Sequence, residues 1–145
     1  MAFAIKDFVK SNHPKDGTDL AEISDKIWEL GSIEEIKEKV NYECFIFHVS
    51  INIVGNWQCG GWYAIIQNQN SLIPYVAQTL DEIGLQEIRE VFQNVLLSIP
   101  VSLSLDEQCQ QKIENLDDFT DRYWGFNAQS DGWESVLNYF HAHLK

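Results

Sequence analysis

The chain has 145 residues, 45% of them hydrophobic, and its 22 acidic and 10 basic side chains give a formal net charge of −12. This length suits a single domain with its own core, and the charge excludes nucleic acid and anionic membranes as favourable partners while favouring cationic ones. No apolar stretch approaches the roughly 20 residues of a membrane span, and the first seven residues lack the basic and apolar regions of a secretory signal.

The N-terminal part predicts helices separated by turns. Residues 1–17 predict a short helix or a loosely attached arm, ending in a turn-rich segment. Apolar residues at helical spacing follow over residues 18–30, and Gly31 ends that helix. Ser32 and Glu35 then form a capping-box pattern, in which each side chain bonds the backbone amide of the other residue. A second helix is therefore expected to begin at Ser32.

A long neutral segment predicts the middle of the fold. Residues 44–80 contain no Lys, Arg, Asp or Glu, and charged side chains are rarely buried unless they are paired. Apolar residues keep a helical period from Ile33 to Val54, which predicts one continuous helix. Residues 45–53 also alternate as a half-buried strand does, and periodicity alone leaves both readings open. The capping box and the absence of a breaker favour the helix.

The second half of the chain predicts further helices. Residues 62–67 predict a short apolar helix, and Pro74 suits the first turn of a helix that Gly84 ends. Residues 85–99 form the clearest amphipathic pattern of the chain. More helices are predicted over 106–113, 115–124 and 131–144. Residues 1–145 are thus predicted to form one all-α domain of about seven or eight helices.

Patterns typical of catalysis or metal binding are weak. His141 and His143 are two residues apart, so on a helix they point about 200° from each other. The three cysteines have no CxxC spacing, which predicts reduced thiols and a cytoplasmic location: Cys44, Cys59 and Cys109. His48 lies in an apolar helix and is best interpreted as a core histidine. No catalytic residue, metal or cofactor is predicted, and we expect a protein that is not an enzyme.

Acidic residues outside the first turns of helices are the better candidates for function. In a first turn, a carboxylate complements the amide dipoles and needs no partner to explain it. Like charges three or four residues apart on one face cost a few tenths of a kcal/mol per pair. Such pairs indicate either a solvated face or a surface that occupies a basic DNA-binding site. The residues predicted to contact a partner come from such pairs, two of which include a first-turn residue, Asp117 or Asp118: Glu87, Glu90, Glu114, Asp117, Asp118 and Asp121.

The segment from Cys59 to Leu85 resembles a bacterial family classed as a domain of unknown function, one member of which is a DNA mimic that binds a helix-turn-helix repressor. The family pattern is Asn-Gly-Gly-Phe, then Gln, aromatic residues and Asn, then a helix ending in Ile-Gly-Ala. Here the corresponding residues are Cys59, Gly60, Gly61, Trp62, Ala64, Asn68, Ile83, Gly84 and Leu85. Residues 116–124 look like its late acidic and aromatic segment, and the likeness covers roughly residues 32–144, which form the family-like core. Cys59 and Ala64 depart from the family, so any role of those polar side chains is absent here.

The resemblance implies an all-α fold and a homodimer, and it adds support for the helix over residues 33–54. The leading hypothesis is a non-enzymatic acidic protein, a DNA mimic that occupies the basic surface of a DNA-binding regulator or nuclease. One alternative is an immunity-type protein that neutralises a toxin. The other is a small-ligand binder or enzyme that uses a cleft near Trp57, Trp62 and His48. Neither direct nucleic-acid binding nor membrane binding is expected.

Overall fold

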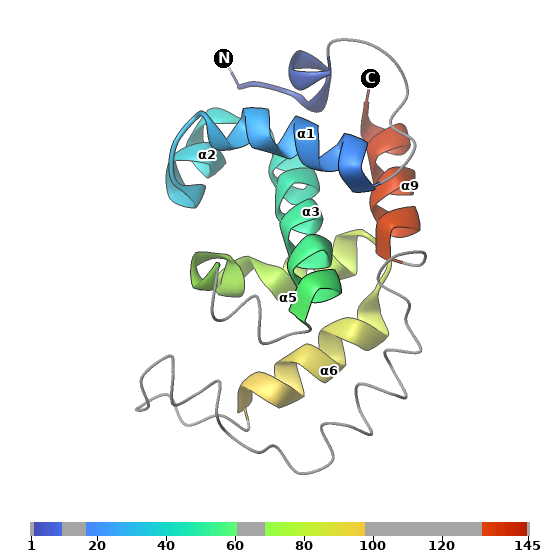
Figure 1. Cartoon of the computed structure of the whole chain (residues 1–145). Coiled ribbons are helices and arrows are strands. Elements are labelled where there is room, and N and C mark those ends of the chain that lie inside the picture. The colour runs from blue at the N-terminus through green and yellow to red at the C-terminus, as the bar shows by residue number, and fades with distance from the viewer. Residues whose placement is uncertain (1, 10–16, 61–68, 98–131, 145) are drawn as a thin grey trace.

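The computed structural model describes residues 2–9, 17–60, 69–97 and 132–144, which are helical (Figure 1). They form two short 3₁₀ helices and six α-helices: η1 (Ile5–Phe8), α1 (Gly17–Trp28), α2 (Ile33–Lys39), α3 (Tyr42–Gly60), η2 (Asn70–Leu72), α5 (Ile73–Glu82), α6 (Gln86–Leu97) and α9 (Trp133–His143). The all-α class is therefore confirmed. The predicted helices over 62–67, 106–113 and 115–124 lie outside the described residues, so the total of seven or eight stays a prediction.

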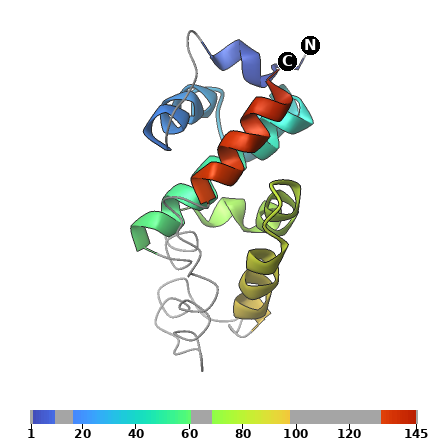
Figure 2. The same cartoon turned by 90° about the vertical axis from the view of Figure 1, so that its right-hand side faces the viewer.

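The central element is α3, against which α1, α5 and α9 pack (Figure 1, Figure 2). Every side chain from Cys44 to Ser50 is buried. A helix with apolar residues on all sides is typical of a buried core element. Because no face of this segment is polar, helical and strand periodicities coexist in it. The prediction of a helix rather than a strand over residues 45–54 is confirmed.

The prediction of one continuous helix over residues 33–54 is wrong at its middle, because α2 and α3 are separate helices. Val40 is extended, with φ −113° and ψ 162°. It forms an isolated parallel β-bridge with Phe3, and the amide of Asn41 donates to the carbonyl of Phe3 at 2.7 Å. The side chain of Asn41 then accepts from the amide of Cys44 at 2.8 Å. Asparagine is a favoured N-cap. Asn41 is therefore the sequence signal for a new helix start, which the continuous hydrophobic period obscured.

The described N-terminal residues 2–9 pack against the rest of the molecule. Ile5 and Phe8 of η1 are buried, and the ring of Phe3 meets that of Phe8 edge to face at 5.8 Å. The short helix among the two predicted alternatives is therefore present, and a loosely attached arm does not describe these residues. Residues 10–16 lie outside the described part.

The predicted helix boundaries at Ser32 and Gly84 are confirmed by hydrogen bonds. The amide of Ser32 donates to Oε1 of Glu35 at 3.2 Å, and the amide of Glu35 donates to Oγ of Ser32 at 3.3 Å. The hydrogen bond from the backbone of Ser32 also lowers the pKa of Glu35. Gly84 has φ +84°, and the amide of Leu85 donates to the carbonyl of Leu80 at 2.8 Å. This is a Schellman motif, which favours glycine because its φ is positive.

Candidate functional site

Two of the six acidic residues predicted to contact a partner can be placed. Glu87 and Glu90 lie on α6 and are exposed, whereas Ile88 and Phe92 of the same helix are buried. The two carboxylates therefore project from the side of α6 that faces away from the core. The other four predicted residues lie outside the described part of the chain: Glu114, Asp117, Asp118 and Asp121.

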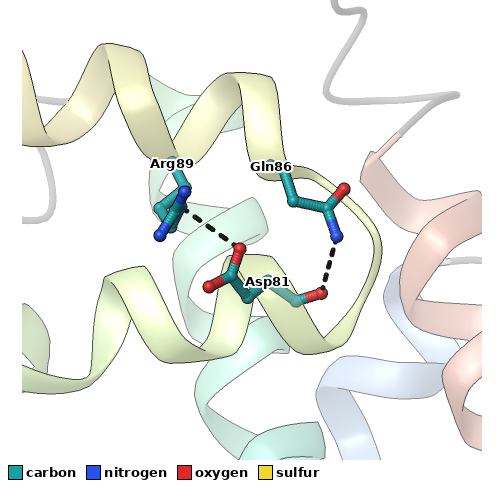
Figure 3. A network of polar contacts seen from close by, with 3 residues as sticks. All are labelled: Asp81, Gln86 and Arg89. Carbon is teal, nitrogen blue, oxygen red and sulfur yellow. Dashed lines mark hydrogen bonds and ion pairs between the residues drawn. The ribbon is translucent and has the colours of Figure 1, made fainter.

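The one basic residue of α6 is directed away from these two carboxylates. Figure 3 shows Arg89 turned toward Asp81 of α5, with Gln86 beside them. Nε of Arg89 lies 3.2 Å from Oδ1 of Asp81, and the side chain of Gln86 donates to the carbonyl of Asp81 at 3.4 Å. This is the only ion pair between two described residues. Glu87 and Glu90 consequently have no cation bound to them within the described part of α6.

Several other carboxylates are used to hold the fold together. The hydroxyl of Tyr75 donates to Oε1 of Glu34 at 2.6 Å, which joins α2 to α5. The hydroxyl of Tyr42 donates to Oε1 of Glu82 at 3.1 Å, which joins α3 to α5. Together with two carboxylates in local turns and one in the ion pair, these acidic side chains form contacts between described residues: Asp7, Glu34, Glu35, Asp81 and Glu82.

The outward face of α1 is acidic, and the sequence reasoning did not select it. Glu22, Asp25 and Glu29 are all exposed, and their spacing of three and four residues puts neighbouring carboxylates on one side of the helix, about 5–6 Å apart. None of the three forms a hydrogen bond or ion pair with a described residue, and Lys26 of the same helix pairs with none of them. We name these three residues the α1 acidic row. Their sequence signal was the like-charge spacing that also marked Glu87 and Glu90.

The acidic residues described so far belong to different helices. α1 packs against the middle and C-terminal half of α3, where Ser24 contacts His48 and Asn52. α6 meets the same half of α3 through the ring of Phe92, 6.1 Å from that of Trp57. That these carboxylates build one contiguous field stays a prediction.

The residues of the family-like motif are only partly described. Gly60 is the last residue of α3, and Gly84 ends the turn after α5. Gly61, Trp62 and Asn68 lie outside the described residues.

The expected cleft near Trp57 and His48 does not open at those two residues. His48 is fully buried, and Trp57 is 6% exposed with its ring 6.1 Å from that of Phe92. Trp62, the third residue of that expected site, is not described. The two described aromatic rings therefore belong to the core.

A groove lies instead between α1, α3 and the start of α9. Its volume is about 340 Å³, at the lower end of the range for small-molecule sites. Its polar lining comes from Ser24 and Asp25 of α1 and from Asn52 and Asn56 of α3. Trp133 lines it from α9. The remaining lining residues are apolar or lack a side chain: Ala21, Ile51 and Gly55.

The floor of the groove is a hydrogen-bonded network centred on Asn52. Its Oδ1 accepts from Nε1 of Trp28 at 3.2 Å and from Nε2 of Gln69 at 3.1 Å. Its Nδ2 donates to Oγ of Ser24 at 3.0 Å and to the carbonyl of His48 at 2.8 Å. All four hydrogen-bonding positions of the amide are therefore occupied. The contact with a backbone carbonyl fixes which end of the amide is the donor.

His48 lies beneath the groove as part of the same network. Its Nδ1 is 2.8 Å from Oγ of Ser24, and the ring of Trp28 meets it edge to face at 4.4 Å. Nε2 is buried and has no hydrogen-bond partner among the described residues. Burial lowers the pKa of His48 to about 3, so the ring is neutral near pH 7. The interpretation as a core histidine is confirmed, although one ring nitrogen is unsatisfied.

The other groups that could react or bind metal are inert or absent in the described part. The thiol of Cys44 is free and buried, and burial raises its pKa to about 12. Within the described residues no three His, Cys, Asp or Glu side chains are grouped so as to hold a metal ion. None of the described helices combines the length and apolarity that a membrane span requires.

Comparison of the chain with family models, curated proteins and solved structures finds no match. The resemblance to the DNA-mimic family therefore stays a prediction from the motif residues.

Proposed function

We propose that this protein is a non-enzymatic acidic interaction protein that binds the basic surface of a protein partner. The partner surface that suits this acidic protein is one that normally binds phosphates, as on a DNA-binding regulator or a nuclease. The protein therefore acts as a DNA mimic. The immunity-type function uses the same chemistry with a basic toxin as the partner.

The α1 acidic row is the observation that carries this proposal. Five described carboxylates form contacts with other described residues, whereas Glu22, Asp25 and Glu29 form none and lie side by side on one exposed helix face. Like charges at this spacing destabilise a helix by a few tenths of a kcal/mol per pair, and Lys26, the one lysine within four residues of all three, forms no ion pair with them. A basic partner converts that repulsion into attraction. Glu87 and Glu90 offer a second, smaller acidic face on α6.

The net charge supports the same conclusion at long range. A formal charge of −12 creates a field that accelerates encounter with a cationic partner and repels nucleic acid. Such attraction is screened over a Debye length of about 8–10 Å near physiological ionic strength. Binding is therefore expected to weaken steeply as salt is added.

Affinity capture followed by competition tests the proposal. We expect the tagged protein to retain a basic protein from a bacterial lysate at about 50 mM NaCl and to release it at about 500 mM NaCl. The captured protein is then purified, and its complex is challenged with a short duplex DNA. Displacement by the duplex at equilibrium supports DNA mimicry, because both ligands then require the same basic surface.

The partner and the competition distinguish the alternatives. A basic toxin whose activity is neutralised, with no displacement by DNA, assigns the immunity-type function. A partner retained equally at both salt concentrations contradicts the electrostatic proposal in either form. A variant with three neutral isosteres on α1, E22Q/D25N/E29Q, should retain less partner at low salt while unfolding at the same or a slightly higher urea concentration than the wild type, because it removes like-charge repulsion on the helix.

A further inference from the structure

The hydrogen bonds around the groove leave two acceptor groups free on α1 and α3. Asn52 has all its positions occupied, and Oγ of Ser24 is bonded to both His48 and Asn52. Nδ2 of Asn56 donates to the carbonyl of Asn52 at 2.8 Å and to Oε1 of Gln69 at 2.5 Å. Both donor hydrogens of Asn56 are thereby used. Its Oδ1 and the carboxylate of Asp25 have no partner among the described residues.

The orientation of the Asn56 amide is fixed by its partner. The carbonyl of Asn52 is only an acceptor, so the group that contacts it must be the NH₂ end of the Asn56 side chain. The oxygen is then the end without a described partner. Asp25 adds a negative charge on the facing helix, at a residue that is also part of the α1 acidic row.

We propose that the groove between α1, α3 and α9 binds the guanidinium group of an arginine side chain from the basic protein partner. A cationic group with several donors is the complement of two free acceptors, one of them charged. Arginine suits the site better than lysine because its planar fork of five N–H donors can reach two acceptors at once and pack flat against an aromatic ring. Trp133 supplies such a ring, and Ile51 supplies an apolar surface for the aliphatic stem.

The dimensions favour one side chain over a peptide segment. A volume of about 340 Å³ fits a single long side chain, and typical interfaces spread over a far larger area. The groove therefore acts as an anchor within a wider acidic contact. This inference rests on the proposed function for the identity of its occupant, and it is tested first with small probes.

Titration with N-acetyl-arginine amide, followed by NMR, tests the groove without any partner. We expect the side-chain amide of Asn56 and the backbone amides of Ser24 and Asp25 to shift on titration, with millimolar affinity. N-acetyl-citrulline amide is the matched probe, because it has the same shape without the charge. It should bind at least about fivefold more weakly, since the charge-assisted hydrogen bond to Asp25 is lost.

Two pairs of variants separate the groove from general electrostatics. D25N and E22Q remove the same charge from adjacent turns of α1, but only Asp25 lines the groove. D25N should weaken arginine-amide binding about fivefold, and E22Q by less than about twofold. In G55A the added methyl group would lie 3.8 Å from the ring of Trp133, an ordinary contact. G55A should therefore fold, narrow the groove and weaken binding.

Each outcome bears on the inference separately from the proposed function. Equal binding of the arginine and citrulline probes, or equal weakening by D25N and E22Q, overturns the groove proposal even if a basic partner binds the protein. Specific arginine-amide binding supports the groove even if no partner is captured.

Discussion

Replacement of Asn52 by alanine is expected to lower the free energy of unfolding by about 2–3 kcal/mol, because it leaves several partly buried groups without partners. Trp28 and Gln69 lose the acceptor that holds their side chains, and Ser24 loses a donor. For a domain of this size the corresponding fall in Tm is about 5–10 °C. Urea unfolding followed by circular dichroism measures the change directly.

Asn56 provides the matched control for this prediction. It lies one helical turn from Asn52 on the same helix, but it bonds only the carbonyl of Asn52 and the side chain of Gln69. N56A should therefore cost only about 1 kcal/mol, the usual net value of an intramolecular hydrogen bond. Equal losses in the two variants would show that Asn52 is not the centre of the network.

Acidification is expected to destabilise the protein through His48. The unfolded chain binds a proton at His48 near the ordinary pKa of 6.5, whereas burial lowers the folded-state pKa to about 3. The unfolded state therefore binds more protons below about pH 6.5, and stability falls as pH decreases. Between about pH 7.5 and pH 5 this single group lowers the free energy of unfolding by about 2 kcal/mol.

Urea unfolding at several pH values checks this expectation with two variants. H48N has no titrating ring and keeps an amide near Oγ of Ser24, so it should lose most of the decline over this pH range, even if it is less stable at pH 7.5. H141N changes an exposed histidine on α9 and should keep the wild-type decline. A decline that is the same in wild type and H48N would mean that His48 is not buried as a neutral ring.

Much of the fold was predictable because local signals agree with the tertiary structure. The capping box at Ser32, Pro74 in the first turn of α5 and Gly84 after it are local, and each is found where the sequence placed it. The break between α2 and α3 was missed because Val40 keeps the hydrophobic period while its backbone is extended. Its bridge partner, Phe3, is remote in sequence, and periodicity carries no information about such a contact.

The candidate site was less predictable, because it depends on which polar groups already have partners. Sequence patterns selected Glu87 and Glu90 correctly as exposed, but did not reveal that Arg89 pairs with Asp81. The groove depends on Ser24 of α1 and Asn52 of α3 meeting across 28 positions of sequence. The free oxygen of Asn56 follows only from the hydrogen bonds of its neighbours. These are properties of packing between helices rather than of any one segment.

The two proposals describe one mode of binding at different distances. At long range, the net charge draws in a basic partner, and the α1 acidic row orients it. At contact, Asp25 belongs both to that row and to the groove, so the same carboxylate guides the partner and bonds its arginine. The α6 face, on a different helix from the row and the groove, is expected to contribute less to this contact.

The association rate of the captured partner as a function of salt is the most direct test of the central claim. We predict that E22Q/D25N/E29Q lowers the rate about tenfold near 50 mM NaCl and reduces its dependence on salt. E87Q/E90Q, on the second acidic face, should change the rate by less than about threefold. Wild-type rates in both variants, or a larger effect from the α6 pair, would contradict binding through α1.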